Sequence, residues 1–410
     1  MPRSSRCADN AGQCRCEPLT RACTCVLSII FQKNSLKYFS KLLTALQEEA
    51  IMMLKYFSKR EAMSLPSRRR TRATLDEVAK RAGVSRTTAS LVLSGKASTH
   101  RISEETHRRV KEAAQELDYS PNLLVRSIQR GRTHVLSFFN AFRLRTENDL
   151  YMDRLSTAIE RAAGKLGYDV LVHCDFSRPP EETYRFLNGG RADGLLLFAP
   201  LPDDPLLPLL RRSRLPVVLI NARDSEGILP SVRDDMQGGM RQVAEALVAL
   251  GHRHIAAMIE EGSDFRDAIP RVRLLQQYLR ALGGDLPDQS VFSYWNEGQR
   301  ILERLLHEPR PPTAIFCWRD WLAYRLLEDC DRLGIEVPSR LSVIGYDGLH
   351  WPATTRHIAA SVYVDLDALA ESAVRLLHQY ITGEREDYAD VTIPVQLRYG
   401  TTLDAVSVSG

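Results

Sequence analysis

Two short stretches near residue 80 place apolar side chains at helical spacing. The apolar face holds Leu75, Val78, Ala79 and Ala82 in the first stretch and Ala89, Val92 and Leu93 in the second. Thr74, with Glu77 three residues later, predicts a capping box at the start of the first helix, and Gly83 predicts its left-handed end. Ser85 predicts the N-cap of a second helix that stops at Gly95.

A third helix is expected after Ser103, which is followed by Glu104 and Glu105 in the first turn. Its apolar positions are Val110, Ala113, Ala114 and Leu117. Two short helices across a tight glycine turn place the second helix in a DNA major groove. We expect DNA contacts from Thr74, Ser85, Arg86, Thr87, Thr88, Ser90, Leu91 and Arg101. An ordinary helical hairpin is the alternative interpretation.

Beyond residue 134 apolar strands alternate with amphipathic helices. Strands are expected at 134–140, 168–174, 193–199, 216–222, 254–260, 290–295, 313–318, 341–347, 361–365 and 391–397. Helices are expected at 149–166, 181–188, 236–250, 267–282, 297–307, 320–333 and 366–382. This alternation is typical of parallel α/β folds, and the number of strands favours two lobes with a ligand cleft at the carboxyl ends of strands. The fold class is therefore an N-terminal all-α helix-turn-helix domain plus a two-lobed α/β domain with parallel sheets flanked by helices.

Charge differs between these two parts. From Ser64 to His134 there are 15 Lys and Arg residues against 7 Asp and Glu, whereas residues 135–410 hold 30 against 39. A basic small domain attracts DNA phosphates, and the larger acidic part does not. The run Arg68, Arg69, Arg70 and Arg72 is expected to be a flexible, phosphate-contacting arm. The asymmetry favours DNA binding over a plain hairpin.

Residues 73–403 resemble the lactose-repressor/galactose-repressor family of bacterial transcription regulators. The resemblance rests on L-x-x-V-A-x-x-A-G-V-S from Leu75, on the third helix, and on Y-x-P-N at 119–122. It implies a bilobed domain similar to periplasmic sugar-binding proteins, and a hinge helix that inserts an apolar residue, here Ile128, into the minor groove. The implied hinge contacts are Asn122, Val125, Arg126 and Ile128. Ala89 and Leu91 depart from the Val and Arg common in the family, so the operator of its best-known members does not transfer.

The resemblance also implies positions that contact an effector: Asn221, Arg271, Arg273, Trp295, Arg319 and Asp347. By this resemblance Arg273 grips ligand oxygens, Trp295 is a stacking wall and Asp347 ends a strand in the cleft. The alternatives are helix-start charges for the arginines, a core residue for Trp295, and a cap or turn former for Asp347. If Arg273 and Arg319 both face the cleft, a sugar phosphate or sugar acid is favoured over a neutral sugar.

Residues 1–62 lie outside the resemblance. Their cysteines, Cys7, Cys14, Cys16, Cys23 and Cys25, lack paired C-x2-C spacing, so we expect no metal site. The sequence LKYFSK at 36–41 recurs 18 residues later at 54–59. One interpretation of the repeat is chance or a repeated amphipathic helix, and the other is upstream DNA that has been translated as protein. The repeated peptide can be encoded by a nucleotide sequence that equals its own reverse complement. The two copies of that sequence would lie about five turns of the DNA helix apart. We therefore hypothesise that Met63 is the true start and that the repeat is a pair of operators.

No nucleotide-binding, hydrolase or metalloprotease motif occurs, so we expect a binding protein without a cofactor and not an enzyme. The expected domains are an extension (1–62), a helix-turn-helix domain (63–120), a hinge segment (121–133) and a two-lobed effector-binding and dimerisation domain (134–404). The expected function is a cytoplasmic, ligand-responsive transcription regulator, with a repressor favoured. It would bind palindromic double-stranded DNA as a homodimer, or a higher oligomer, and a sugar-like effector. The alternative is a sugar-binding protein without specific operator recognition.

Overall fold

The computed structural model describes residues 73–94, 102–120, 131–141, 149–173, 177–260, 268–294 and 300–406. The chain divides into two units between Ser120 and Pro121. The expected extension, its cysteines and its repeat lie outside the described residues, as do residues 121–130 of the expected hinge.

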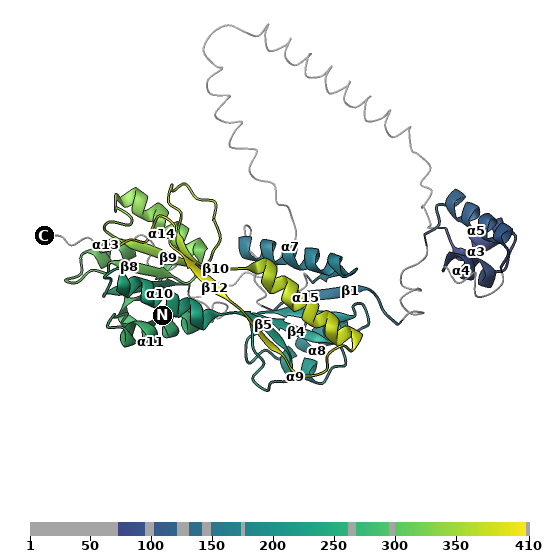
Figure 1. Ribbon diagram of the computed structural model, residues 1–410, viewed down its shortest axis with the longest axis horizontal. Helices are drawn as coiled ribbons and strands as arrows, with labels where there is room; N and C mark the ends of the chain where they lie inside the picture. The colour runs from purple at the N-terminus through teal and green to yellow at the C-terminus, as the bar shows by residue number, and fades with distance from the viewer. Residues whose placement is uncertain are drawn as a thin grey trace, which may run out of the picture. The chain divides into compact units, whose positions relative to one another are not determined.

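The described part of the first unit holds α3 (Leu75–Ala82), α4 (Arg86–Leu93) and α5 (Glu104–Glu116) (Figure 1). The capping box of α3 is present: the Glu77 amide donates to Thr74 Oγ1 (3.3 Å) and the Thr74 amide to Glu77 Oε2 (2.7 Å). Gly83 ends the helix with φ of +66°. Ser85 caps α4 by accepting a hydrogen bond from the Thr88 amide at 3.0 Å.

A small apolar core holds these helices together. It consists of Val78, Ala79, Ala82, Ala89, Val92, Val110, Ala113 and Ala114, all buried. An ion pair between Arg81 Nη2 and Glu116 Oε2 (2.7 Å) links α3 to α5 at the surface. The core occupies the inner face of α4 and leaves its outer face available for contacts.

The second unit begins with a lobe built on a six-stranded sheet in the order β11-β5-β4-β3-β1-β2, in which every pair is parallel. Its strands are β1 (Val135–Asn140), β2 (Asp169–Val172), β3 (Gly194–Phe198), β4 (Val217–Ile220), β5 (Ser231–Asp234) and β11 (Asp390–Ile393). Helices α7 (Leu150–Lys165) and α15 (Leu366–Thr382) lie side by side on one face (Figure 1). Helices α8 (Pro180–Leu187) and α9 (Leu206–Arg211) cover the other.

The second lobe has a six-stranded sheet in the order β12-β10-β9-β8-β6-β7. Its strands are β6 (Ile255–Ile259), β7 (Val291–Ser293), β8 (Ala314–Cys317), β9 (Ser342–Asp347), β10 (Ala360–Val364) and β12 (Val395–Arg398). Only β12 runs antiparallel to its neighbour. The helices are α10 (Met236–Ala249), α11 (Ala268–Ala281), α13 (Arg300–Leu306) and α14 (Asp320–Leu333), with a 3-10 turn, η3 (Asp288–Ser290).

The chain passes between the lobes three times, after β5, after β10 and between β11 and β12. Aspartates cap the helices at the first two passages: Asp235 accepts from the Gly238 amide and Asp365 from the Ala368 amide, both at 2.9 Å. The third passage contains Pro394. The helix caps define where the chain enters each lobe at the first two passages. Because the passages are short, few residues can bend between the lobes.

Two expectations about the elements were wrong. Residues 391–397 form two strands in different sheets, because Pro394 has no amide hydrogen with which to continue a ladder. Strand β5 and helix α9 were not expected: β5 is short and ends in two charged residues, and α9 contains Pro208. The other nine expected strands and the seven expected helices are present; the helices at 320–333 and 366–382 have the expected bounds, and the other elements have shifted ends.

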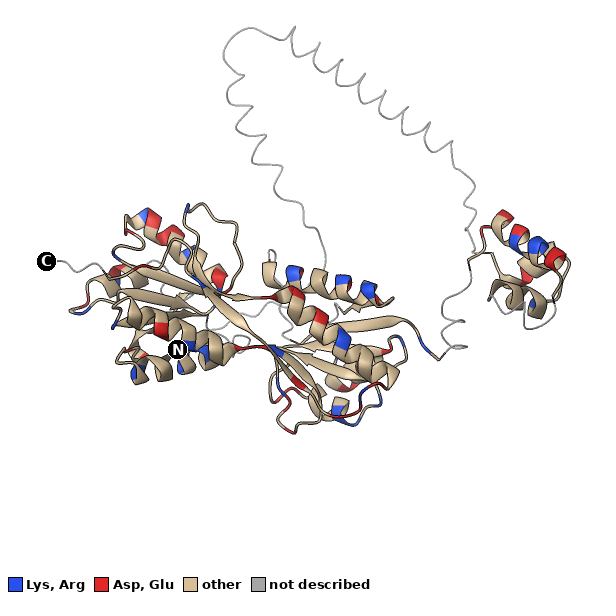
Figure 2. Cartoon of the chain, in the orientation of Figure 1, with Lys and Arg blue, Asp and Glu red and all other residues tan. Residues whose placement is uncertain are grey.

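Charged residues lie mainly on helices and loops, and the strands are largely uncharged (Figure 2). The inner strands read as continuous apolar runs; β3 and β4 are fully buried, as expected for parallel sheets covered on both faces. Among the described residues, no helix combines the length and apolar character needed to cross a membrane.

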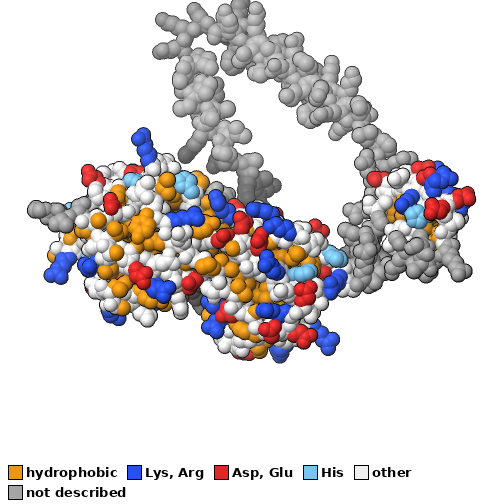
Figure 3. Space-filling model, in the orientation of Figure 1, with side chains coloured by type: hydrophobic (Ala, Val, Ile, Leu, Met, Phe, Trp, Pro, Cys, Tyr) orange, Lys and Arg blue, Asp and Glu red, His pale blue; other side chains and the backbone are white. Residues whose placement is uncertain are grey.

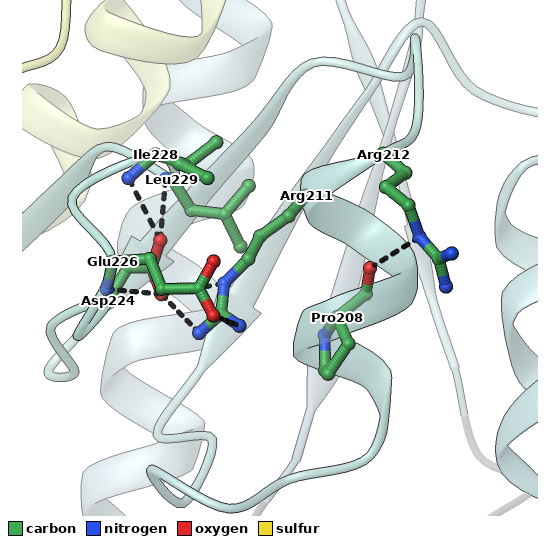
Figure 4. Close-up of polar contacts among 7 residues, drawn as sticks. All are labelled: Pro208, Arg211, Arg212, Asp224, Glu226, Ile228 and Leu229. Carbon is green, nitrogen blue, oxygen red and sulfur yellow. Dashed lines mark hydrogen bonds and ion pairs between the residues drawn. The ribbon is translucent and has the colours of Figure 1, made fainter.

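A buried ion pair fastens the loop that joins β4 to β5 (Figure 4). Asp224 accepts from Arg211 Nε (3.0 Å) and from the backbone amides of Ile228 (2.9 Å) and Leu229 (3.0 Å). The Asp224 side chain is fully buried, so these donors replace its lost hydration. The loop is therefore held firmly between the two strands.

Candidate functional site

The outer face of α4 is the candidate DNA-reading surface. Arg86 and Thr87 are exposed at its first turn, while Thr88, Ser90 and Leu91 are half-buried. Part of this polar chemistry is already used for capping, since Ser85 Oγ lies 2.8 Å from Thr88 Oγ1. The arrangement leaves Arg86 and Thr87 as the side chains most available to a base edge or phosphate.

Arg86 supplies a positive charge to the outer face of α4. Its Nη1 lies 3.6 Å from Asp76 of α3, and the two side chains are 69% and 66% exposed. A pair this exposed contributes little to stability, so Arg86 can exchange Asp76 for a nucleic-acid acceptor at small cost. Thr74 remains exposed beside Glu77 as the cap of α3. Of the other expected DNA contacts, Arg101, Asn122, Val125, Arg126 and Ile128 lie outside the described residues.

In the second unit a pocket of about 100 Å³ lies between the lobes. The first lobe contributes residues of α7 and of the ends of β3, β4 and β5: Asp149, Tyr151, Met152, Phe198, Ala199, Asn221 and Asp234. The second contributes Met236, Arg271, Trp318, Arg319, Trp321, Asp347 and Trp351. The pocket therefore sits at the carboxyl ends of parallel strands, where α/β folds bind ligands.

The backbone at this pocket is strained at three strand ends. Ala199 (φ +47°), Asn221 (φ +52°) and Asp347 (φ +106°) all adopt positive φ although none is glycine. Such conformations cost free energy and persist where the surrounding structure enforces them, commonly at functional sites. All three residues line the pocket.

Arg271 is a buried cation in the pocket wall. Its Nη1 donates to the Trp318 carbonyl oxygen (2.7 Å) and lies 4.0 Å from Asp347 Oδ1. Its guanidinium carbon is 3.8 Å from the centre of the Tyr346 ring, a cation–π contact. Burial raises the pKa of Asp347 to about 7, although Arg271 and Arg319 oppose that rise.

Arg319 is the second cation of the wall. Its Nη2 lies 2.8 Å from Glu260 Oε1 and 2.6 Å from Oε2. Glu260 also accepts from Trp318 Nε1 at 3.2 Å. The guanidinium carbon of Arg319 lies 5.2 Å from the ring centres of both Trp318 and Trp321.

Neutral donors and acceptors complete the pocket. Asn221 Nδ2 donates to Tyr151 Oη at 2.7 Å, and the Tyr346 hydroxyl donates to Asp234. Burial raises the pKa of Tyr151 well above its usual value, helped by nearby Asp234 and Asp347, so its hydroxyl stays protonated at neutral pH. The first lobe thus offers hydroxyl, amide and carboxylate groups to a ligand.

Four of the six expected effector contacts line the pocket: Asn221, Arg271, Arg319 and Asp347. Trp295 lies outside the described residues. Arg273, expected to grip the ligand, does not line the pocket; its Nη1 bonds Asp288 Oδ1 (2.7 Å) and Gln276 Oε1 (3.0 Å). The physical reason is helix phase, because Arg271 lies on the buried face of α11 with Ala268, Val272 and Leu275, and Arg273 does not.

The sequence interpretation missed several pocket residues. Tyr151, Asp234, Trp318, Trp321 and Trp351 line the pocket, and Glu260 stands behind it. A usable signal existed for three of them: Glu260 and Trp318 end expected strands, and Trp321 begins the helix that follows Arg319. Asp234 belongs to the strand that was not expected, so nothing marked its position.

Two family descriptions match parts of the chain. Residues 74–122 match the family described as bacterial regulatory proteins, lacI family. Residues 244–403 match the periplasmic binding protein-like domain. The first match contains the helix-turn-helix, and the second contains the second lobe with the later elements of the first.

Known relatives match over most of the chain. The HTH-type transcriptional repressor PurR of Erwinia tasmaniensis is 28% identical over 353 residues, covering 82% of this chain and 97% of that protein. The transcriptional regulator CelR in complex with cellobiose is a structural match, with TM-score 0.57, 26% identity, and coverage of 81% and 100%. The lac repressor dimer bound to operator and the anti-inducer ONPF has TM-score 0.69, 23% identity, and coverage of 82% and 100%.

The expected fold and family are thereby confirmed, and the relatives are repressors, not enzymes. A capped helix-turn-helix, which matches the first description, precedes two lobes that enclose a pocket, and residues 244–403 of these lobes match the second description. The chain belongs to the lacI family of bacterial regulatory proteins, as a DNA-binding transcription repressor with a ligand-binding domain.

Proposed function

We propose that this repressor binds palindromic operators as a homodimer and that a small, sugar-like effector in the cleft controls this binding in the bacterial cytoplasm. The single observation that carries the proposal is the joining, in one chain, of an exposed DNA-reading helix, α4, to a strained, polar pocket between two lobes. Each chain supplies one reading helix, which suits one half-site, so a palindromic site calls for a two-fold partner.

Exposed apolar side chains support association between copies. Hydrophobic groups reach the surface over both lobes on the face that Figure 3 shows. Large exposed examples include Ile228, Ile358 and Tyr399. Surface of this kind is common where proteins associate, although single exposed residues are ordinary.

The pocket chemistry favours a neutral polyhydroxylated ligand. Trp318, Trp321 and Trp351 offer flat apolar faces, and Asn221 and Asp234 offer hydrogen-bonding groups. The anionic effector considered from the sequence required Arg273 in the cleft, and Arg273 pairs with Asp288 instead. In the related regulator CelR the bound ligand is the disaccharide cellobiose.

The proposed control is a coupling between the two sites. A ligand held by both lobes favours one arrangement of the lobes, and the three passages after β5, β10 and β11 carry that change through the second unit. Because the coupling is reciprocal, operator binding must change ligand affinity by the same factor.

Selection of duplexes from a random pool tests operator recognition. We expect enrichment of an inverted repeat, because two copies of α4 read equivalent half-sites. Enrichment of unrelated sequences, or none, would favour a ligand-binding protein that attaches to DNA non-specifically.

A thermal-shift screen of neutral sugars and their acidic counterparts tests the effector class. We expect neutral sugars to raise the melting temperature, since a ligand that binds only the folded state stabilises it. Stabilisation by sugar acids alone would contradict the neutral class.

A further inference from the structure

Glu260 stands immediately behind the pocket wall. It follows β6, its side chain is only 1% exposed, and it is absent from the pocket lining. Its two carboxylate oxygens lie 2.8 and 2.6 Å from Arg319 Nη2, and it accepts a hydrogen bond from Trp318 Nε1 at 3.2 Å. For a carboxylate buried this deeply, a cation and hydrogen-bond donors must replace the lost water.

Arg319 connects Glu260 to the pocket. Its side chain is 28% exposed and lines the cavity, against the rings of Trp318 and Trp321. A guanidinium that faces a cavity between aromatic rings is a strong partner for an anionic ligand. The bond to Glu260 offsets that charge from behind and holds the group in one orientation.

The offset by Glu260 matters most when Asp347 is protonated, because Asp149 and Asp234 alone then equal Arg271 and Arg319 in number. Asp149, Asp234 and Asp347 line the same pocket, and Arg271 lies 4.0 Å from Asp347. Among the described residues at this site, the carboxylates are Asp149, Asp234, Asp347 and Glu260, and they outnumber the cations Arg271 and Arg319. Counting the described residues alone, the site with Glu260 in place carries no net positive charge that would attract an anion.

We propose that Glu260 is a positioning residue that sets the ligand class: it neutralises Arg319, so the pocket accepts neutral polyhydroxylated ligands and rejects anions. Removing the charge of Glu260 converts Arg319 into an anion-binding group. The inference rests on the proposed ligand-binding role of the cleft and is independent of whether the chain recognises an operator.

Inorganic phosphate is the probe for this proposal, because it tests anion binding without knowledge of the effector. Melting temperatures of the full chain are compared in phosphate and in chloride at equal ionic strength, near pH 6, where Asp347 is mostly protonated. We expect about 20 mM phosphate to raise the melting temperature of Glu260→Gln by about 3 °C and to leave wild type unchanged. The double variant Glu260→Gln/Arg319→Gln should lose the shift.

Three results would overturn the proposal: no shift in Glu260→Gln, an equal shift in wild type, or a shift that survives in the double variant. No shift in Glu260→Gln would mean that the variant gains no anion binding. An equal shift in wild type would mean that the wild-type pocket does not exclude anions, and a shift in the double variant would mean that phosphate binds away from Arg319. None of them involves DNA, so they leave the test of operator recognition untouched.

Chemical rescue gives a second measurement, which decides the question if Glu260→Gln does not fold. Arg319→Ala leaves the Glu260 carboxylate buried without its cation. We expect methylguanidinium to restore part of the lost melting temperature in Arg319→Ala, and to have no such effect in wild type or in Glu260→Gln/Arg319→Ala. Equal effects in all three proteins would show that Glu260 and Arg319 do not act as a pair.

Discussion

Asp347 is the pocket residue whose protonation depends most clearly on its surroundings. Burial raises its pKa from the ordinary 3.8 to about 7, so the folded chain holds the proton more tightly than the unfolded chain does. The stability that this residue contributes is therefore fully present below about pH 4 and is lost as the pH rises through about 7.

Asp347→Asn removes this titration while keeping the shape of the side chain. We expect the free energy of unfolding of wild type, relative to Asp347→Asn, to fall between about pH 4 and 7. The fall should be about 1.4 kcal/mol for each unit by which the pKa is raised. Urea unfolding of both ligand-free proteins across this window measures the difference, and parallel pH profiles would contradict it.

The two arginines of α11, Arg271 and Arg273, differ in burial and in their partners. Arg271 is buried against Tyr346 and Asp347, so Arg271→Ala should reduce the free energy of unfolding by about 2–4 kcal/mol. Arg273 pairs with Asp288 at the surface, where the side chains are 63% and 72% exposed, so Arg273→Ala should cost less than about 0.5 kcal/mol. Urea unfolding compares them, and equal losses would refute the assignment.

Single residues show where sequence interpretation succeeded and where it failed. Asn221 and Asp347 line the pocket, and each lies at the end of a recognisable apolar strand. Arg273 was favoured as the gripping arginine from local motif alone, whereas the 3.6-residue period of α11 distinguishes it from Arg271. Glu260 was missed because its role depends on Arg319, which is 59 residues away in the chain.

Among the helices, α4 carries the proposed contact with DNA. Arg86→Ala should weaken binding to the selected duplex by about tenfold or more, because a good arginine contact to a base is worth about 1–3 kcal/mol. Arg81→Ala is the matched control, since it removes the same charge from the same unit but pairs with Glu116. Gel-shift titration at one salt concentration separates them. Equal losses would indicate a general charge effect and not reading by α4.

The loop between β4 and β5 tests how firmly the pocket strands are held. Asp224→Ala leaves Arg211, only 9% exposed, with the more exposed Glu226 as its carboxylate and removes the acceptor of the Ile228 and Leu229 amides, so it should reduce the free energy of unfolding by about 2–4 kcal/mol. Asp367→Ala is the control, because its 3.4 Å pair with Arg161 is exposed and should cost less than about 0.5 kcal/mol. A loss of similar size in both variants, measured by urea unfolding, would rule out the special role of the loop.

Most elements followed from periodicity, and the failures have local causes. The caps at Thr74, Ser85 and Ser103 were read directly from side-chain chemistry. Pro394 divided one apolar run between two sheets, and this division depends on the tertiary fold more than on the composition of the run. Strand β5 is recognised only by its neighbours β4 and β11, which pair with it on either side.

For the molecule as a whole, the two lobes explain why a ligand can act at a distance. Each sheet has its own covering helices, and the connections between the lobes are three short passages. Groups from both lobes meet where the strand ends of the two sheets line the pocket. A ligand that contacts both sides therefore biases how the lobes sit together, which is the physical requirement for control of DNA binding.

The most direct test of the central claim is the affinity of the full chain for the selected duplex and for a scrambled duplex of equal length, measured by fluorescence anisotropy at one salt concentration. A sequence-specific repressor should prefer the selected duplex by about 10³-fold or more. Equal affinities, falling together as salt is raised, would contradict the account and reduce the first unit to a non-specific cationic tether.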